Sequence, residues 1–415
     1  MNPKNIPHVV VIGAGFGGMH AVKKLAGKPV HVTLIDKRNY HLFQPLLYQV
    51  ATAGISPHEI AYPVRAIFQK QKNFSFLMTR VHGVDFDRKV VLTEQSEVAY
   101  DYLIIAAGAS VNFFGNASLQ QNALPLKDVS DAVDIRNHIL KKFELAAQEQ
   151  DERKRQGLLT FVAVGGGPTG VESAGALSEL IRLVLRRDYP SMDLKSVRVI
   201  LVEAADRLLA AMPSELQASA IRSLESKRVE VQLNAKVRDY DGQQVTLADG
   251  TLIPCETLLW SAGVKAASLM SKLGLEQVSM GRVKVLPTLQ LPVHSNVYII
   301  GDAAYFEENG KPLPMVAPVA TQQGEQAVEN ILADLQGKPL KTFRYTDMGS
   351  MATIGRNAAV AHAFGMKFHG FMAWVVWLVV HLIGLIGFRN RLIVLINWTW
   401  DYFFYDRAVR LISRE

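Results

Sequence analysis

Six glycines in this chain have the spacing that suits dinucleotide binding. They form two G-x-G-x-x-G loops and are Gly13, Gly15, Gly18, Gly165, Gly167 and Gly170. Each loop follows a short apolar run, and a helical pattern follows each loop. In that context the glycines permit a tight turn, and the backbone amides at the start of the helix can bind a pyrophosphate. The two loops therefore predict two dinucleotide sites in one chain.

An acidic residue ends the next apolar run after each loop. Asp36 lies 23 residues after the first glycine of its loop, close to the spacing of a carboxylate that binds an adenosine ribose. Glu203 lies 38 residues after the first glycine of its loop, and the extra length falls in the polar segment 186–196. A carboxylate at Glu203 would repel the 2′-phosphate of NADPH and so favour NADH, whereas the nearby Arg207 would act in the opposite sense.

Further similarities between the two halves indicate a duplicated domain. Segments 101–108 and 256–263 share an acid, a leucine two positions later and a terminal Ala-Gly, and they end 95 and 98 residues after their loops begin. A third apolar run, 296–304, contains Gly-Asp and follows the second copy. The first domain is therefore expected to be discontinuous, with the second domain inserted in it.

The composition excludes several functions. Cys255 is the only cysteine among 415 residues, so the chain can form no internal disulfide, redox cysteine pair or thiolate metal cluster. The eleven histidines show no metal-ligand spacing beside a carboxylate, and we expect no metal site. The net charge is +7, but no basic run carries interleaved aromatic residues, so we expect no nucleic-acid partner. An apolar strand begins by about residue 8 without a preceding signal sequence, which favours the cytoplasm.

Two dinucleotide sites have a chemical purpose if one binds a flavin and the other a nicotinamide. The nicotinamide delivers a hydride, and the flavin accepts it and passes electrons to a different acceptor. At this point the residues leave the acceptor open.

The chain resembles the two-dinucleotide-binding flavoprotein reductases, and more narrowly the type II NADH dehydrogenases, which are NADH:quinone oxidoreductases. The resemblance covers essentially the whole chain. It rests on residues 36–55 (DKRNYHLFQPLLYQVATAGI), 165–177 (GGGPTGVESAGAL), 299–304 (IIGDAA), 316–324 (VAPVATQQG) and 349–361 (GSMATIGRNAAVA), and on the aromatic C-terminal segment. Only the glycine loops are generic, and the other motifs are fairly specific to this family.

The resemblance implies an α/β fold of two Rossmann-like domains, the second inserted in the first, followed by a helical C-terminal membrane anchor. The expected parts are an FAD-binding domain (1–115 and 286–340), a connecting helical segment (116–158), an NADH-binding domain (159–285) and an anchoring region (341–415).

The resemblance also implies non-covalent FAD at the first loop and NADH at the second. Asp36 would bind the adenosine ribose of FAD and Asp302 its ribityl chain, while Glu203 would bind the adenosine ribose of NADH. The backbone of Ala320 and Thr321 would contact the flavin ring. The other residues expected to bind the cofactors are Gly17, Lys37, Ala107, Gly108, Gly263 and Gly301.

Glu172, Gln322 and Gln323 are predicted to be catalytic. Glu172 is expected in the first turn of the helix after the second loop, where the helix dipole alone stabilises an acid by ~0.3–1 kcal/mol. The resemblance implies a role near the flavin instead, in orienting NADH or in proton transfer to the reduced quinone. The quinone segment departs from the family at Pro318, where some members have glutamine, and this puts the first polar contact to the quinone in doubt.

Residues 370–388 are apolar on every side except at His381. As one helix they would extend about 28 Å, close to the ~30 Å hydrocarbon core of a bilayer. They could form a spanning helix, a buried core or dimer-interface segment, or a monotopic helix in one leaflet. The resemblance favours the last, with residues 370–415 on the lipid bilayer at the cytoplasmic side of the cell membrane. The residues that suit such an interface are Trp398, Trp400, Tyr402, Tyr405, Arg389, Arg391, Arg407, Arg410 and Arg414.

The predicted function is hydride transfer from NADH to FAD and transfer of two electrons to a membrane quinone. We expect no proton pumping, because residues 370–388 hold no carboxylate. Lys367 is a candidate for the mouth of the quinone path, although a lone lysine is more often a solvated charge. The alternative is a soluble or peripheral NAD(P)H-dependent flavin reductase with another acceptor. Disulfide and sulfide:quinone oxidoreductases are disfavoured by the single cysteine. The choice of quinone and the oligomeric state, a homodimer included, stay open.

Overall fold

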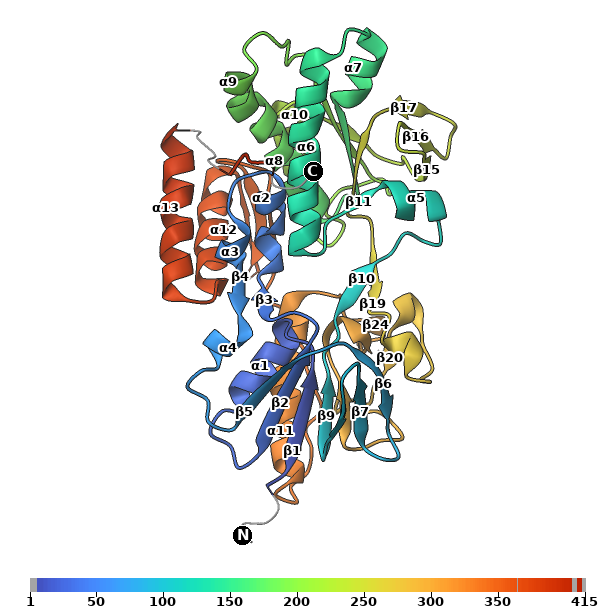
Figure 1. Ribbon diagram of the computed structural model, residues 1–415, viewed down its shortest axis with the longest axis vertical. Helices are drawn as coiled ribbons and strands as arrows, with labels where there is room; N and C mark the ends of the chain where they lie inside the picture. The colour runs from blue at the N-terminus through green and yellow to red at the C-terminus, as the bar shows by residue number, and fades with distance from the viewer. Residues whose placement is uncertain (1–5, 364, 405–408, 413–415) are drawn as a thin grey trace. The chain divides into compact units, whose positions relative to one another are not determined.

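The computed structural model describes residues 6–363, 365–404 and 409–412 (Figure 1). The chain divides into two compact units, neither of which is continuous in sequence. Unit 1 comprises residues 1–41, 62–110 and 264–347, and unit 2 comprises residues 42–61, 111–263 and 348–415. Most of unit 2 is therefore inserted between segments of unit 1, in agreement with the inserted domain expected from the repeated motifs.

A parallel five-stranded sheet forms the centre of unit 1. Its order is β21-β9-β1-β2-β5, and all neighbours are parallel. The strands are β1 (His8–Ile12), β2 (His31–Asp36), β5 (Phe74–Met78), β9 (Tyr102–Ile105) and β21 (Val297–Ile299). β1 and β9 consist mainly of buried valine, isoleucine and leucine, as strands covered on both faces require. β21 comes after the 111–263 region in the sequence and pairs with β9. A strand C-terminal to the insertion therefore completes the sheet of unit 1.

Two helices of unit 1 pack closely against each other. α1 (Phe16–Lys24) begins within the first glycine loop, and α11 (Ala317–Asp334) follows the Gly-Asp motif in sequence. They lie side by side, and a Cβ added to Gly324 would lie 2.3 Å from the carbonyl oxygen of Gly17, so this crossing requires glycine (Figure 1). The smaller elements of the unit are α4 (Val64–Ile67), β6 (Val81–Asp85), β7 (Val90–Thr93), β8 (Glu97–Ala99), β19 (Val264–Ala266), β20 (Val283–Lys284), β22 (Ala304–Tyr305), β23 (Glu307–Glu308) and β24 (Lys311–Pro312).

Unit 2 is built on a second parallel sheet of the same kind. Its order is β11-β18-β12-β13-β14. The strands are β11 (Leu124–Pro125), β12 (Thr160–Val164), β13 (Arg198–Val202), β14 (Val229–Gln232) and β18 (Thr257–Trp260). An antiparallel sheet of β15 (Val237–Tyr240), β16 (Gln244–Leu247) and β17 (Leu252–Pro254) packs on the same apolar core. The two sheets confirm the predicted α/β fold class.

The helix that follows the second glycine loop explains the long distance to Glu203. α8 (Pro168–Glu179) continues through a π-helical segment (Leu180–Leu185) into α9 (Arg186–Asp188), and β13 begins only at Arg198. The predicted insertion is therefore an extended helix followed by a loop. The other helices of the unit are α2 (Leu47–Ala51), α3 (Pro57–Ile60), α5 (Ala117–Asn122), α6 (Val129–Gln148), α7 (Glu152–Leu158) and α10 (Ser214–Ser226).

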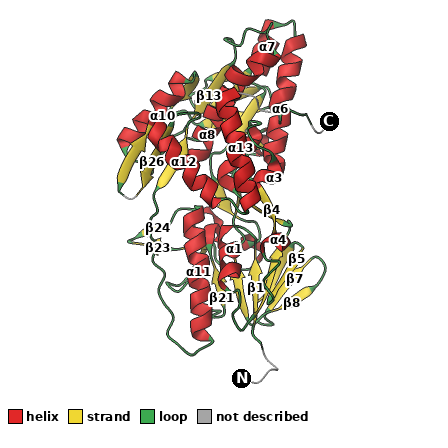
Figure 2. Ribbon diagram, turned by 90° about the vertical axis from the view of Figure 1, so that its left-hand side faces the viewer, coloured by secondary structure: helices red, strands yellow, loops and turns green. Residues whose placement is uncertain are grey.

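The C-terminal part of unit 2 is a three-stranded antiparallel sheet followed by two helices. The strands are β25 (Ser350–Thr353), β26 (Ala359–Ala363) and β27 (Met366–His369). α12 (Gly370–Gly384) and α13 (Phe388–Phe404) lie side by side (Figure 2). The apolar stretch 370–388 is thus not one helix, because α12 ends at Gly384 and Gly387 adopts a positive φ of 87°. Within the described ranges, no helix combines the length and apolar character that crossing a bilayer needs.

Candidate functional site

The first glycine loop forms an open cradle at the start of α1. Gly13 has a φ of +104°, and a Cβ there would lie 2.2 Å from the Ala106 carbonyl oxygen. A Cβ on Gly18 would lie 1.9 Å from the Gly13 carbonyl oxygen, so the helix can pack on the strand only without a side chain. Gly15 has nothing within 4 Å on its side-chain side, and no side chain caps α1. Open space beside uncapped amides is what a pyrophosphate requires, so the loop fits a dinucleotide.

Two side chains hold this loop in place. Asp36, at the end of β2, accepts hydrogen bonds from the backbone N–H of Ala14 at 2.7 Å and of Arg38 at 2.8 Å. Nδ1 of the buried His41 lies 2.8 Å from the carbonyl oxygen of Ala14, so this nitrogen must carry a proton. Burial lowers the pKa of His41 to about 4, and the ring is neutral. The sequence indicated Asp36 but not His41, whose role depends on its burial. Lys37 is exposed beside Asp36.

The Gly-Asp motif and the start of α11 lie in the same unit as this loop. Gly301 has a φ of +66° and donates its N–H to Oε1 of Gln323 at 2.7 Å, while a Cβ on it would lie 3.0 Å from the Cβ of Ala320. Gln322 makes two hydrogen bonds of 2.9 Å with the backbone of Thr346. Both glutamine side chains thus form hydrogen bonds with backbone groups. Their predicted roles at the quinone stay predictions.

The remaining residues predicted to contact FAD lie after strands of unit 1 or in α11. Ala107 and Gly108 follow β9, and the Cα of Ala107 would lie 3.5 Å from a Cβ on Gly13. Asp302 is half-buried in the short helical turn 301–303, and Thr321 is half-buried in α11. The predicted set is therefore brought together around one sheet edge.

The second loop repeats the geometry of the first. Gly165 has a φ of +116°, a Cβ on Gly170 would lie 1.8 Å from the Gly165 carbonyl oxygen, and Gly167 has nothing within 4 Å on its side-chain side. No side chain caps α8 at its N-terminus, where Pro168 is the first residue. This loop also fits the pyrophosphate of a dinucleotide. Gly263, after β18, has a φ of +109° and leaves no room for a side chain beside Phe114.

Glu203 occupies the place that Asp36 has in unit 1. Its carboxylate accepts the N–H of Gly166 and, at 2.7 Å, the N–H of Ala205. Arg207 is exposed and forms two hydrogen bonds with the neighbouring Asp206, at 2.6 and 2.8 Å. Asp206 therefore offsets the positive charge of Arg207, which was expected to weaken the preference for NADH over NADPH.

Glu172 lies in a position that differs from the one predicted. The first turn of α8 contains no acid, and Glu172 follows that turn. Its side chain is only 7% exposed, and burial raises its pKa to about 8, although the amide of Thr353 and the indole N–H of Trp377 act to lower it. A helix dipole would favour the charged form, so dipole complementarity does not account for this residue. Glu172 is a carboxylic acid that holds its proton at neutral pH.

Close packing of α8 against the end of β25 and the residues that follow it creates the environment of Glu172. Thr353 donates its N–H to Glu172 at 3.4 Å, and a Cβ on Gly175 would lie 2.5 Å from the carbonyl oxygen of Ile354. One turn further on, Glu179 accepts the N–H of Arg356 at 2.7 Å. Gly175 thus lets the helix lie directly on this backbone. No sequence pattern indicated Thr353 as a neighbour of Glu172.

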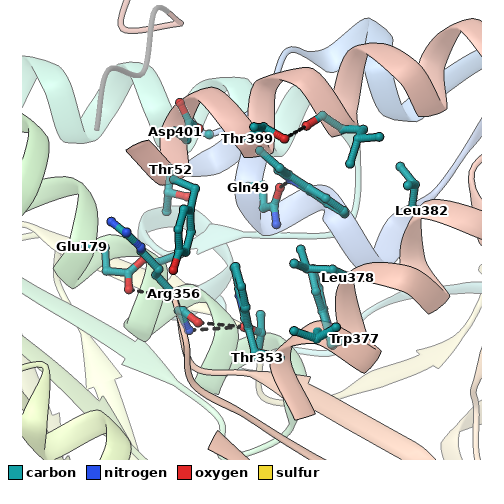
Figure 3. A pocket seen from close by; sticks show the side chains of 18 of the residues that line it. Gln49, Thr52, Glu179, Thr353, Arg356, Trp377, Leu378, Leu382, Thr399 and Asp401 are labelled. Atoms are coloured by element: carbon teal, nitrogen blue, oxygen red, sulfur yellow. Dashed lines mark hydrogen bonds between the residues drawn. The ribbon is translucent and has the colours of Figure 1, made fainter. Parts of the chain in front are cut away.

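A cavity of about 540 Å³ lies in unit 2 beside these residues (Figure 3). It is bounded by α2, α8 with its π-helical extension, the end of β25, α12 and α13. Thr353 and Trp377 line the cavity and also face Glu172. The side chain of Trp377 is 1% exposed, stacks on His381 at 4.0 Å, and its N–H has no hydrogen bond of good geometry within the described residues. Lys367 does not line the cavity and instead pairs with Glu215 on the surface at 3.1 Å.

α13 holds two asparagines against the protein and exposes several large apolar side chains. Asn390 donates to the carbonyl oxygen of Glu59 at 3.1 Å, Asn397 to Oε1 of Glu59 at 2.9 Å, and Trp398 to Oε1 of Gln49 at 2.8 Å. The outward side chains are 46 to 68% exposed, and they are Leu392, Ile396, Trp400 and Phe403. α12 likewise exposes Phe371, Met372, Val379 and Ile383. Tyr405, Arg407 and Arg414, predicted for the same interface, lie outside the described residues.

Within the described residues, no group of three or more histidine, cysteine, aspartate or glutamate side chains could hold a metal ion. Cys255 is buried, and its burial raises the pKa of the thiol to about 12.

Comparison with known proteins shows the family to which this chain belongs. The pyridine nucleotide-disulphide oxidoreductase model matches residues 7–324, which include both loops, and the NDH2 C-terminal domain model matches residues 348–406. The type II NADH:quinone oxidoreductase Ndh of Mycobacterium tuberculosis is 41% identical over 428 residues, which cover 100% of this chain and 92% of that protein. The chain therefore belongs to the type II NADH:quinone oxidoreductases.

Solved structures support the fold. NDH2 from Plasmodium falciparum in complex with NADH matches with a TM-score of 0.90 at 20% identity, over 99% of this chain and 100% of that chain. The sulfide:quinone oxidoreductase of Aquifex aeolicus matches with a TM-score of 0.73 at 18% identity, over 96% of each chain.

Proposed function

We propose that this chain oxidises NADH through bound FAD and passes two electrons to a membrane quinone without moving protons across the bilayer. The observation that carries the proposal is a buried Glu172, whose pKa burial raises to about 8, beside a largely apolar cavity in a chain with two dinucleotide loops. Membership of the type II NADH:quinone oxidoreductases supports the same reaction.

The two loops divide the cofactors between the units. In unit 1 the open side of Gly15 would hold the pyrophosphate of FAD, with Asp36 and Asp302 on its sugar portions. In unit 2 the open side of Gly167 would hold the pyrophosphate of NADH, with Glu203 at the adenosine ribose. When bound, the two groups supply hydride transfer and onward electron transfer. The protein contributes binding and orientation.

Glu172 would serve the proton chemistry of the reaction. Reduction of a quinone by two electrons consumes two protons, so a proton donor must be near. A carboxylic acid with a pKa of about 8 is protonated at neutral pH and close enough in pKa to release the proton. α12 adds no acid of its own, and the titratable side chain in it is His381, whose pKa burial lowers to about 4. This supports proton uptake without transport across the bilayer.

The outward apolar face of α12 and α13 would lie on lipid. A helix with asparagines inside and leucine, isoleucine and aromatic side chains outside is the reverse of a helix on a water-soluble surface. We infer attachment to the cytoplasmic face of the cell membrane, in one leaflet, where NADH is available from water. The arginine side chains near the ends of α13 would meet anionic head groups.

An anaerobic titration tests the catalytic proposal. NADH should bleach the bound flavin of the purified protein, and a quinone added afterwards should restore the flavin absorbance with stoichiometric loss of quinone. If NADH bleaches the flavin and quinone does not reoxidise it, the chain is a flavin reductase with another acceptor.

A binding assay with vesicles tests the membrane proposal. Ile396→Glu and Phe403→Glu place charges on the outward face of α13 and should move the protein from vesicles that contain anionic lipid into the supernatant. Val293→Glu is the matched control, because Val293 is 84% exposed in unit 1. If the α13 variants and the control bind vesicles equally, α13 is not the attachment site. Light scattering on the purified protein without vesicles distinguishes a monomer from a homodimer.

A further inference from the structure

An exposed aromatic side chain of unit 2 sits on a strained backbone. Phe114 follows β10 (Ala109–Val111) and has a φ of +53°, in the left-handed region where a bulky side chain is rare. The residue is 63% exposed. A glycine would adopt this φ without strain, and a single exposed apolar residue is common on protein surfaces. The two features together need an explanation, because the fold bears strain here in order to hold an aromatic ring in water.

Hydrogen bonds on both sides of Phe114 fix this conformation. The N–H of Phe114 donates to Oδ1 of Asn112 at 2.9 Å, and the carbonyl oxygen of Asn112 accepts the indole N–H of Trp260 at 3.0 Å. The buried ring of Trp260, at the end of β18, lies edge-on to the ring of Phe114 with 6.4 Å between their centroids. After the turn, Asn116 donates its N–H to the carbonyl oxygen of Phe113 at 3.0 Å. The position of the exposed ring is therefore set by the end of β18.

The ring lies beside the second glycine loop. A Cβ on Gly263 would lie 2.8 Å from Cζ of Phe114, so the tip of the ring covers the backbone directly after β18. The preceding residue, Ala262, lies against the loop itself, because a Cβ on Gly165 would be 3.0 Å from both its N and its Cα. Phe114 and the loop thus lie at the same edge of the sheet, at the carboxyl ends of β12 and β18.

The topology of this sheet decides which half of a dinucleotide reaches the ring. In the order β11-β18-β12-β13-β14, the chain runs from β12 through β13 to β14 on one side and returns at β18 on the other side, so the switch point lies between β12 and β18. The pyrophosphate would lie on the loop after β12, and Glu203, after β13, would bind the adenosine ribose. The other half of the cofactor must then extend over the end of β18. For NADH, that half is the nicotinamide riboside.

We propose that Phe114 packs against the nicotinamide riboside half of NADH and orients it on unit 2. The proposal rests on the proposed function, which assigns the second loop to NADH. The nicotinamide offers a planar face to an aromatic side chain, and binding would remove the exposed face of the Phe114 ring from water. Because the strained turn fixes the ring before the cofactor arrives, little side-chain freedom is lost on binding. Phe114 binds the cofactor in this way and takes no part in hydride transfer itself.

The experiment compares the binding of NAD⁺ and of ADP to the full-length, FAD-loaded protein by titration calorimetry. ADP keeps the adenosine and the pyrophosphate of NAD⁺ and lacks the nicotinamide riboside. NAD⁺ cannot reduce the oxidised flavin, so both ligands bind without a reaction. The ratio of the two dissociation constants therefore isolates the contribution of the nicotinamide riboside half.

Phe114→Gly should raise the Kd for NAD⁺ by about fivefold or more, which is the lower end of what stacking on an aromatic side chain contributes, and should leave the Kd for ADP within about twofold of wild type. Leu252→Ala is the matched control, because Leu252 is 55% exposed in β17 of the same unit. It should change neither constant by more than about twofold. If Phe114→Gly weakens both ligands equally, or weakens neither, the ring does not contact the nicotinamide riboside half and the proposal is overturned.

Two further variants separate loss of the ring from a change in the turn. Phe114→Asn also removes the ring, and asparagine tolerates a left-handed backbone, so this variant should match Phe114→Gly. Phe114→Tyr keeps the ring and should bind both ligands as wild type does, with flavin content and Tm confirming the fold of all variants. If Phe114→Tyr loses NAD⁺ affinity as Phe114→Gly does, the proposal is overturned.

The same measurements distinguish this proposal from the proposed function. If wild-type protein binds neither NAD⁺ nor ADP, the assignment of the second loop fails and the role of Phe114 fails with it. If wild-type protein binds both ligands but quinone does not reoxidise its flavin, the proposed function fails, while a selective loss of NAD⁺ affinity in Phe114→Gly still supports the role of the ring.

Discussion

Replacing Glu172 by glutamine removes a buried carboxyl group whose burial lowers the stability of the folded state at neutral pH. Burial raises the pKa of this carboxyl from 4.5 to about 8. In the unfolded chain the carboxyl loses its proton above about pH 4.5, whereas in the folded protein it keeps the proton up to about pH 8. Between these values the folded state binds more protons than the unfolded state, so this group lowers stability as pH rises. At pH 7 the difference amounts to about 3 kcal/mol.

Glutamine keeps the shape of the side chain and an oxygen that can accept the Thr353 amide, but it does not titrate. Glu172→Gln should therefore match wild type in stability near pH 4.5 and exceed it increasingly toward pH 8. For a unit of this size, about 3 kcal/mol corresponds to a rise in Tm of roughly 5–10 °C at pH 7. Thermal unfolding of unit 2, followed at a series of pH values, measures the difference.

The same substitution should slow quinone reduction. Loss of a positioned proton donor typically costs on the order of 100-fold or more in rate. In wild type, the rate of flavin reoxidation by quinone should fall as pH rises through about 8, because the carboxyl loses its proton. In Glu172→Gln that rate should be lower and flat over this range, while reduction of the flavin by NADH changes little. Stopped-flow measurements separate the two half-reactions.

Glu215→Gln is the matched control, because it removes an exposed carboxylate whose partner is Lys367 at the surface. It should change neither the pH dependence of Tm nor that of flavin reoxidation. If Glu172→Gln and wild type show the same pH dependence of both quantities, Glu172 is ionised in the folded protein and is not the proton donor.

The remaining predictions concern the two dinucleotide sites. Glu203→Gln should raise the ratio of kcat/KM for NADPH to that for NADH several-fold, because it removes the charge opposed to a 2′-phosphate; an unchanged ratio contradicts the assignment. Gly18→Ala should abolish FAD retention, since its Cβ would lie 1.9 Å from the Gly13 carbonyl oxygen. Gly27→Ala is the control and should retain FAD. A Cβ on Gly27 meets nothing within 4 Å, although its φ of +69° adds mild strain. Flavin absorbance per protein checks the second prediction, and full occupancy in Gly18→Ala rules it out.

The glycine loops were readable from sequence because their geometry is local. A turn at φ above +100°, a strand end and a helix start lie within nine residues, so spacing alone specifies them. The positions of Asp36 and Glu203 were predictable for the same reason, since Asp36 ends β2 and Glu203 directly follows β13. Their hydrogen bonds to loop amides were not predicted, because these require the register of the two parallel strands.

The C-terminal segment shows where local reading fails. Composition predicted one apolar helix for residues 370–388, but α12 ends at Gly384 and α13 begins at Phe388. Several large apolar side chains of both helices are exposed, whereas Asn390 and Asn397 of α13 form hydrogen bonds with Glu59. Hydropathy records how apolar a helix is and not which face meets the protein. That orientation depends on Glu59 and Gln49, more than 300 residues earlier in the chain.

The amino-acid sequence was sufficient to predict the class of fold, the two dinucleotide loops and the acid that follows the second loop. The protonation of that acid depends on how the chain packs in three dimensions. The pKa of Glu172 is set by its removal from water and by the groups around it, and those groups belong to Thr353 and Trp377, the first of them 181 residues away. The cavity beside it likewise exists only where α2, α8, β25, α12 and α13 meet. Spacing along a chain fixes turns and helix starts, whereas burial is a property of packed neighbours that are distant in sequence.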